Sequence, residues 1–283
     1  MKKLYAIIIF SITAAMGMLL LGGLLLLPEN IVDVNSIPFQ KFLQAVQSGL
    51  IFALPAVITV IIFAKNPCNF LRLKQFNQRN FWLTTAFIFT AIPAIGYINL
   101  LNQKMRLPAF LSGIEQKMRA MEDVAAQLTE QFLTVNSIGG LLVNLLVIAL
   151  IAAVCEEVLF RGFLQKVFEK EFKNAHLAIW LSAFIFSAIH LQFYGFFPRM
   201  LLGAAFGYIV FWTGSLWLPI LAHFINNAIG VITFYVAQQR GLNPNIDDIP
   251  LSNSWLFAAA CGLASLLILN KIYLSKSKYS YDL

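Results

Sequence analysis

Long apolar runs, separated by short polar segments, dominate this chain of 283 residues. About 20 consecutive apolar residues are needed to cross the hydrocarbon core of a bilayer as an α-helix. The pattern therefore predicts an all-α fold, a polytopic transmembrane helix bundle with about eight spans. The predicted spans are residues 4–27, 42–64, 81–101, 138–155, 177–190, 199–212, 216–236 and 255–272. The first run is too long for the apolar core of a signal peptide, so we expect a retained first helix.

One segment, residues 109–133, follows a different pattern. Its apolar residues recur in steps of three and four, which is typical of an amphipathic helix. These residues are Leu111, Ile114, Met118, Met121, Ala125, Leu128 and Phe132. Such a helix can serve as a lid or a dimer contact, or it can lie on the membrane surface or on the bundle. We favour the second interpretation.

Composition supports a membrane protein, because 59% of the residues are hydrophobic and 12% are charged. Soluble domains have about 45–50% apolar and about 25% charged residues. Apolar stretches run from one end to the other, so we expect a single membrane domain over residues 1–283 and no separate soluble domain. No basic patch interleaved with aromatic residues is present, so the net charge of +7 does not predict nucleic-acid binding.

The positive charges predict an orientation instead, because Lys and Arg collect in cytoplasmic loops. Basic residues gather at the start of the chain, in the connections 65–80 and 161–175, and in the tail; the opposing loops are acidic or weakly charged. Both termini are therefore predicted to be cytoplasmic. The short loops and the lysine-rich start favour a bacterial inner (plasma) membrane.

The three cysteines, Cys68, Cys155 and Cys261, lie far apart and form no CxxC pair. Neither a disulfide network nor a thiolate zinc site is predicted. Gly203 and Gly207 form a GxxxG pattern, which indicates close packing of helices in lipid.

Ionisable side chains inside membrane spans are costly, so each of them needs a reason. Here the ionisable residues, together with Phe186 and Asn227 near them, form three groups. The groups are Glu156, Glu157 and Arg161; Phe186 and His190; His223 and Asn227. Glu157 and Arg161 are four residues apart, so they share a helix face and can pair. Glu156 points about 100° away and has no local partner.

These residue types form a set that can hydrolyse a peptide bond. A Glu or a His can take a proton from water, and a His or an Asn can donate to the oxyanion of a tetrahedral intermediate. Alternatively, Glu156, His190 and His223 can hold a zinc ion with water in its open position. The sequence contains no HExxH pattern, so three different helices would have to supply those ligands.

The three groups resemble, in order, the motifs of the CPBP intramembrane proteases, a family that includes the CAAX prenyl endoproteases and bacteriocin-processing or self-immunity proteins. The resemblance covers residues 156–227 and implies an eight-helix, CAAX-protease-like fold with a motif-bearing core at about 138–236. It implies that Glu156 activates water together with His190, and that His223 and Asn227 are oxyanion donors. Glu157 and Arg161 would fix the first motif helix.

The resemblance predicts an intramembrane endopeptidase in which Glu and His activate a water molecule. The bilayer and a membrane-associated peptide or protein, prenylated or not, would be its partners, and Zn²⁺ its alternative cofactor. A non-catalytic membrane partner, for bacteriocin immunity or regulatory binding, is the second hypothesis. A transporter that uses the polar residues as a proton relay is third, because no internal repeat is visible.

Overall fold

The computed structural model describes residues 2–26, 33–34, 36–242 and 254–275. The described residues form helices and no β-strand; Leu73 and Ser215 make an isolated bridge. The first half contains α1 Lys2–Leu25, α2 Ile37–Gln47, η1 Ser48–Ala53, α3 Leu54–Phe63, α4 Pro67–Phe70, α5 Gln78–Gln103, η2 Ala109–Leu111 and α6 Ser112–Leu133. The second half contains α7 Ile138–Asn144, η3 Leu145–Ile151, α8 Ala152–Glu157, η4 Val158–Leu164, α9 Gln165–Phe172, α10 Ala175–Ala188, η5 Phe193–Gly195, α11 Phe196–Thr213, α12 Trp217–Gln239 and α13 Trp255–Leu274.

Seven helical stretches among the described residues are long and apolar enough to cross a membrane. They are Leu4–Leu25, Ile37–Phe63, Gln78–Gln103, Ile138–Phe172, Phe193–Thr213, Trp217–Gln239 and Trp255–Leu274. The predicted fifth span coincides with α10, which is apolar but shorter. The prediction of a polytopic all-α bundle is confirmed. The acidic loop near residue 247 and the tail beyond 275 lie outside the described residues.

The predicted end of the fourth span is wrong. The helix does not stop at Cys155 but continues through π-helical turns to Phe172, so residues 161–172 are not a loop. The helix can continue because its charges find partners inside the bundle. Glu157, Arg161 and Glu169 are all 0–1% exposed and take part in ion pairs.

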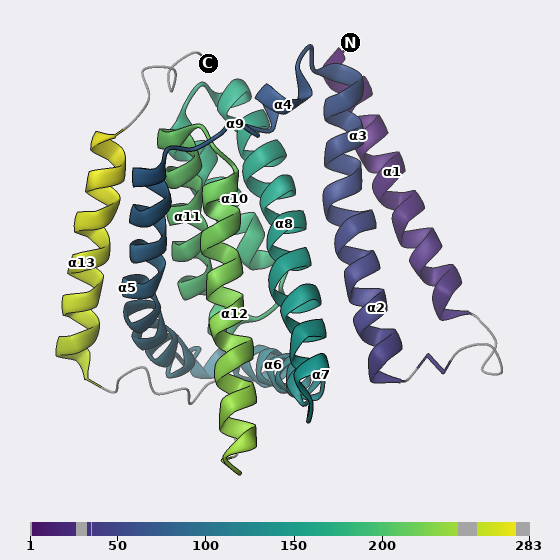
Figure 1. Ribbon diagram of the computed structural model, residues 1–283. Helices are drawn as coiled ribbons and strands as arrows, with labels where there is room; N and C mark the ends of the chain where they lie inside the picture. The colour runs from purple at the N-terminus through teal and green to yellow at the C-terminus, as the bar shows by residue number, and fades with distance from the viewer. Residues whose placement is uncertain (1, 27–32, 35, 243–253, 276–283) are drawn as a thin grey trace.

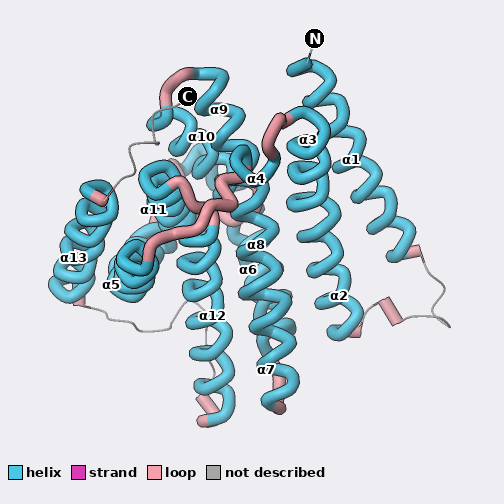
Figure 2. Tube along the Cα trace, turned by 45° about the horizontal axis from the view of Figure 1, so that its top comes forward, coloured by secondary structure: helices cyan, strands magenta, loops and turns pink. Residues whose placement is uncertain are grey.

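The helices stand side by side, with α13 and α5 at one edge and α1 to α3 at the other (Figure 1). Helices α8 and α10 to α12 lie between these edges, and α6 crosses one end of the bundle. At the opposite end, the loop between α4 and α5 runs across the bundle (Figure 2). Two hydrogen bonds tie this loop to the start of α12: Leu216 N–H donates to Arg72 O at 2.8 Å, and Ser215 Oγ to Lys74 O at 2.7 Å.

The amphipathic segment contains α6, and polar contacts attach it to the bundle. Arg119 pairs with Glu115 at 2.7 Å and lies 4.3 Å from the ring centre of Tyr194. The hydrogen bond from Arg119 lowers the pKa of the Glu115 carboxyl. Ile114 and Leu128, on the apolar seam, remain 52% and 46% exposed. This end of the bundle therefore presents apolar side chains on a helix that is held from its other face.

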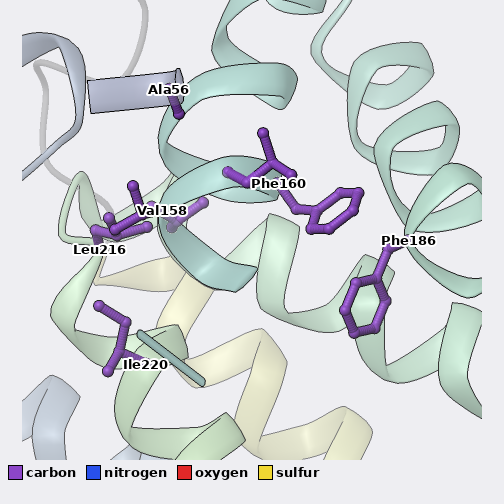
Figure 3. Close-up of a cluster of buried hydrophobic side chains, with 8 residues drawn as sticks. Ala56, Val158, Phe160, Phe186, Leu216 and Ile220 are labelled. Atoms are coloured by element: carbon purple, nitrogen blue, oxygen red, sulfur yellow. The ribbon is translucent and has the colours of Figure 1, made fainter. Parts of the chain in front are cut away.

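A buried apolar cluster joins the helices that carry the three motifs. Phe160 of η4 meets Phe186 of α10 edge-to-face at 5.1 Å, and Val158, Leu216 and Ile220 belong to the same cluster (Figure 3). Large rings in close contact fix the distance between η4 and α10. The positions of the neighbouring polar side chains depend on that distance.

Gly203 and Gly207 let α11 approach its neighbours closely, as the GxxxG pattern predicts. A Cβ atom on Gly207 would lie 2.8 Å from Gln165 Oε1 and 2.9 Å from Ile179 Cγ2. Both contacts are shorter than packed atoms allow. The glycines therefore provide space for the side chains of η4, α9 and α10.

We expect Gly207→Ala to lower the free energy of unfolding by about 1–3 kcal/mol, because an added methyl overpacks this contact. Thermal unfolding of the purified protein in detergent measures the change. Gly230→Ala is the matched control, since a Cβ atom there meets nothing within 4 Å. Equal melting temperatures for the two variants would contradict the role given to Gly207.

Candidate functional site

Glu157 lies at the centre of the candidate site. Its side chain is 0% exposed, and its Oε1 atom lies 2.7 Å from Arg161 Nη1 and 2.8 Å from His223 Nδ1. The pairing of Glu157 with Arg161 that the spacing predicts is confirmed. His223 comes from α12, 66 residues away, and sequence spacing did not indicate this contact.

Arg161 is held on every side. Its Nη2 donates to the carbonyl oxygen of Gly203 at 3.1 Å, and its guanidinium lies 4.5 Å from the ring centre of Phe186. A buried charge is tolerated when it is both paired and hydrogen-bonded. Arg161 meets both conditions, so it supports Glu157 and links α11 to the site.

A row of four buried polar side chains extends from this pair along one face of the helix. The row consists of Glu157, Arg161, Gln165 and Glu169, each four residues after the last. Gln165 Nε2 donates to Glu169 Oε1 at 3.0 Å and to the carbonyl oxygen of Gly207 at 3.2 Å. Glu169 also pairs with Arg72. We name this set the polar row.

Glu156 lies next to His223 and not beside an oppositely charged residue of its own helix. Its Oε2 is 3.8 Å from His223 Nε2, and its side chain is 13% exposed. A carboxylate can only accept, so Glu157 assigns the proton of His223 to Nδ1. The other ring nitrogen, Nε2, faces Glu156. The two adjacent glutamates lie on opposite sides of one imidazole ring.

His190 approaches the site from the end of α10. Its Nδ1 lies 2.8 Å from the carbonyl oxygen of Phe186, which assigns the proton to Nδ1 and leaves Nε2 for another partner. The Phe186 ring meets His190 edge-to-face at 5.1 Å and His223 at 6.0 Å. Phe186 therefore lies between the two imidazoles and sets their separation.

Asn227 shares α12 with His223, but its amide is partly engaged elsewhere. Its Nδ2 donates to the carbonyl oxygen of Ile148 at 3.3 Å, and its Oδ1 accepts from Asn226 at 3.2 Å. An amide nitrogen carries two protons. One N–H of Asn227 thus remains for a ligand while the other fixes the side chain against η3.

Arg199 was missed as a site residue by the sequence analysis. It interacts electrostatically with both Glu156 and His190. Its Nη2 donates to Gln192 Oε1 at 2.7 Å, while its buried Nη1 has no hydrogen-bond partner among the described residues. The sequence contains a signal for Arg199, because it is the one charged residue in the apolar stretch 193–213.

The three predicted zinc ligands are not arranged as a metal site. Among the described residues, no group of three His, Cys, Asp or Glu side chains is placed to hold a metal ion together. Glu156 and His223 are neighbours, but His190 does not complete a set with them. Metal analysis of the purified protein tests the zinc alternative.

Fold and site together define a polytopic membrane protein with a glutamate–histidine cluster between its helices. Residues 138–229 match the family model of the type II CAAX prenyl endopeptidase Rce1-like proteins, so this part of the chain is similar to that family. The family resemblance inferred from the three motifs is confirmed.

A relative from Bacillus subtilis (strain 168), described as uncharacterized protein YpbD, is 30% identical over 90 residues. The match covers 30% of this chain and 43% of that protein. No solved structure matches the chain.

We expect Arg161→Met to lower the free energy of unfolding by about 3–5 kcal/mol, because it leaves the Glu157 carboxylate buried without its cation. Unfolding of the purified protein in detergent, followed by circular dichroism, measures the loss.

Arg119→Met is a matched control, because Arg119 and Glu115 form an ion pair with the same four-residue spacing near the surface. Screening by water makes such a pair weak. If Arg161→Met cost no more than Arg119→Met, the Glu157–Arg161 pair would not stabilise the bundle.

Proposed function

We propose that this protein is an intramembrane endopeptidase that hydrolyses a peptide bond in a membrane-associated substrate. The observation that carries the proposal is the position of His223 between two glutamates, with Nδ1 bound to Glu157 and Nε2 facing Glu156. The match to the Rce1-like family model supports the same reaction class, since the matched residues 138–229 include Glu156, Glu157 and His223.

In the proposed reaction, Glu156 takes a proton from a water molecule, whose oxygen attacks the carbonyl carbon of the substrate. Glu156 is the carboxylate suited to this role, because it is partly exposed while Glu157 is fully buried and paired. His190, through Nε2, positions the same water molecule. A general base at the correct distance contributes about 10²–10⁴-fold to such a rate.

The attack converts the carbonyl oxygen into an oxyanion, which needs donors that are already in place. We assign this role to the second N–H of Asn227 and to Nε2–H of His223 in its doubly protonated form, in which Nδ1–H still donates to Glu157. The tetrahedral intermediate then collapses, the C–N bond breaks, and the proton held by Glu156 passes to the leaving amine. Glu157 and Arg161 do not react; they hold His223 in the required orientation.

Prenylated peptides belong to the substrates we propose, because the matching family model is that of CAAX prenyl endopeptidases. A lipidated peptide would be held at the membrane, where the site lies. The orientation with both termini in the cytoplasm and a bacterial inner membrane remain predictions from the distribution of positive charge.

We expect Glu156→Gln to reduce proteolysis by at least about 10²-fold, because the amide cannot accept the proton of water. Mass spectrometry of peptide N-termini, in cells that express each form at equal membrane abundance, measures the products. Glu130→Gln, the same change at an exposed position of α6, is the control and should match wild type.

A non-catalytic membrane protein is the second candidate function. Among the buried side-chain atoms of Glu157, Arg161 and His223, Glu157 Oε2 is the one without a hydrogen-bond partner in the described part of the chain. These contacts can therefore stabilise the bundle without any catalysis. The Glu156→Gln variant separates the two functions, since a nearly isosteric change preserves binding. If folded Glu156→Gln and His190→Ala variants produced the same N-termini as wild type, the endopeptidase proposal would fail.

A further inference from the structure

A cavity lies away from Glu156 and Glu157, on the other side of the helix that carries them. It has a volume of about 1000 Å³, is open on one side, and is lined by α1, α3, the turn into α4, and the η4–α9 segment. Figure 1 shows that α4, α9 and the upper ends of α1 and α3 lie at the same end of the bundle. We call it the α1–α9 groove. It shares no residue with the candidate active site.

The walls of the groove are rich in phenylalanine. They include Phe10, Phe63, Phe70, Phe163, Phe168 and Phe172. Phe10 of α1 stacks on Phe163 of η4 with ring centres 5.2 Å apart, and Phe70 lies 6.4 Å from Phe163. Aliphatic side chains such as Val60 and Val167 add to these walls, and polar or charged residues make up the rest of the lining. The apolar part of the lining suits a hydrocarbon chain.

The lining also contains three lysines, Lys65, Lys166 and Lys170, and one acidic residue, Glu171. Lys166 Nζ lies 3.6 Å from Glu169 Oε2, but this carboxylate is also paired with the buried Arg72. Lys170 Nζ lies 4.6 Å from the centre of the Phe70 ring. Positive charge therefore exceeds negative charge next to the phenylalanine walls.

We propose that the α1–α9 groove binds an anionic glycerophospholipid from the surrounding leaflet, with an acyl chain against the phenylalanines and the phosphate beside the three lysines. In a bilayer the acyl chain gains little from leaving other lipid tails, because those tails are equally apolar. Selection therefore depends on the headgroup. A basic pocket between membrane helices is suited to an acidic headgroup.

The test uses the full chain in nanodiscs that contain equal amounts of phosphatidylglycerol and phosphatidylcholine with identical tails. Native mass spectrometry after release measures which lipid stays bound. Wild type should retain phosphatidylglycerol in preference. Since a lysine near an acidic headgroup contributes about 1 kcal/mol, Lys65→Gln/Lys170→Gln should reduce this preference roughly 25-fold.

Lys74→Gln/Lys271→Gln is the matched control, because both lysines are exposed and neither lines the groove. It should keep the wild-type preference. Val167→Trp fills the groove from α9 and should reduce retention of both lipids. Equal retention of the two lipids by wild type, or an unchanged preference in Lys65→Gln/Lys170→Gln, would overturn the proposal. Undiminished retention in Val167→Trp would place the lipid elsewhere and overturn it too.

Discussion

The buried carboxylate of Glu157 is the constraint on which the rest of this structure depends. A charge inside a membrane bundle is costly unless opposite charge and hydrogen bonds surround it. Arg161 supplies the charge from the same helix, and His223 supplies a donor from α12. Arg161 in turn requires a carbonyl oxygen on α11, which Gly203 exposes. One carboxylate therefore fixes the relative positions of three helices, and the orientation of the imidazole follows from them.

The polar row extends this constraint along the helix. Arg161 and Gln165 are four residues apart, and they donate to the carbonyl oxygens of Gly203 and Gly207, which are also four apart. The two helices are thus held in one register by two equivalent contacts. A Cβ atom at either glycine would crowd the side chain that binds there, at 3.0 Å from Arg161 Nη2 or 2.8 Å from Gln165 Oε1. The glycines of α11 therefore allow close packing and also leave their carbonyl oxygens accessible to hydrogen bonds from Arg161 and Gln165.

Local patterns in the sequence predicted what depends on neighbouring residues. Apolar runs predicted the helices, and a spacing of four predicted the pair of Glu157 with Arg161. The contact of Glu156 with His223 could not be predicted, since it depends on how α8 and α12 pack. The continuation of the fourth helix was missed for a related reason, because Arg161 resembles a loop residue until its buried partners are known. Charge alone does not distinguish a residue in water from one that is paired inside a bundle.

The helix from Ile138 to Phe172 has two functional faces. Glu156 and the polar row face α10 to α12, while Phe163 and Val167 face the α1–α9 groove. The segment η4, which contains both Arg161 and Phe163, is π-helical. Such turns occur frequently at functional sites. A lipid in the groove would pack against η4 and α9 directly behind Arg161 and Gln165. The groove and the glutamate–histidine cluster therefore share one helical wall, so the support that α1 and α3 give that wall contributes to holding Glu157 against His223.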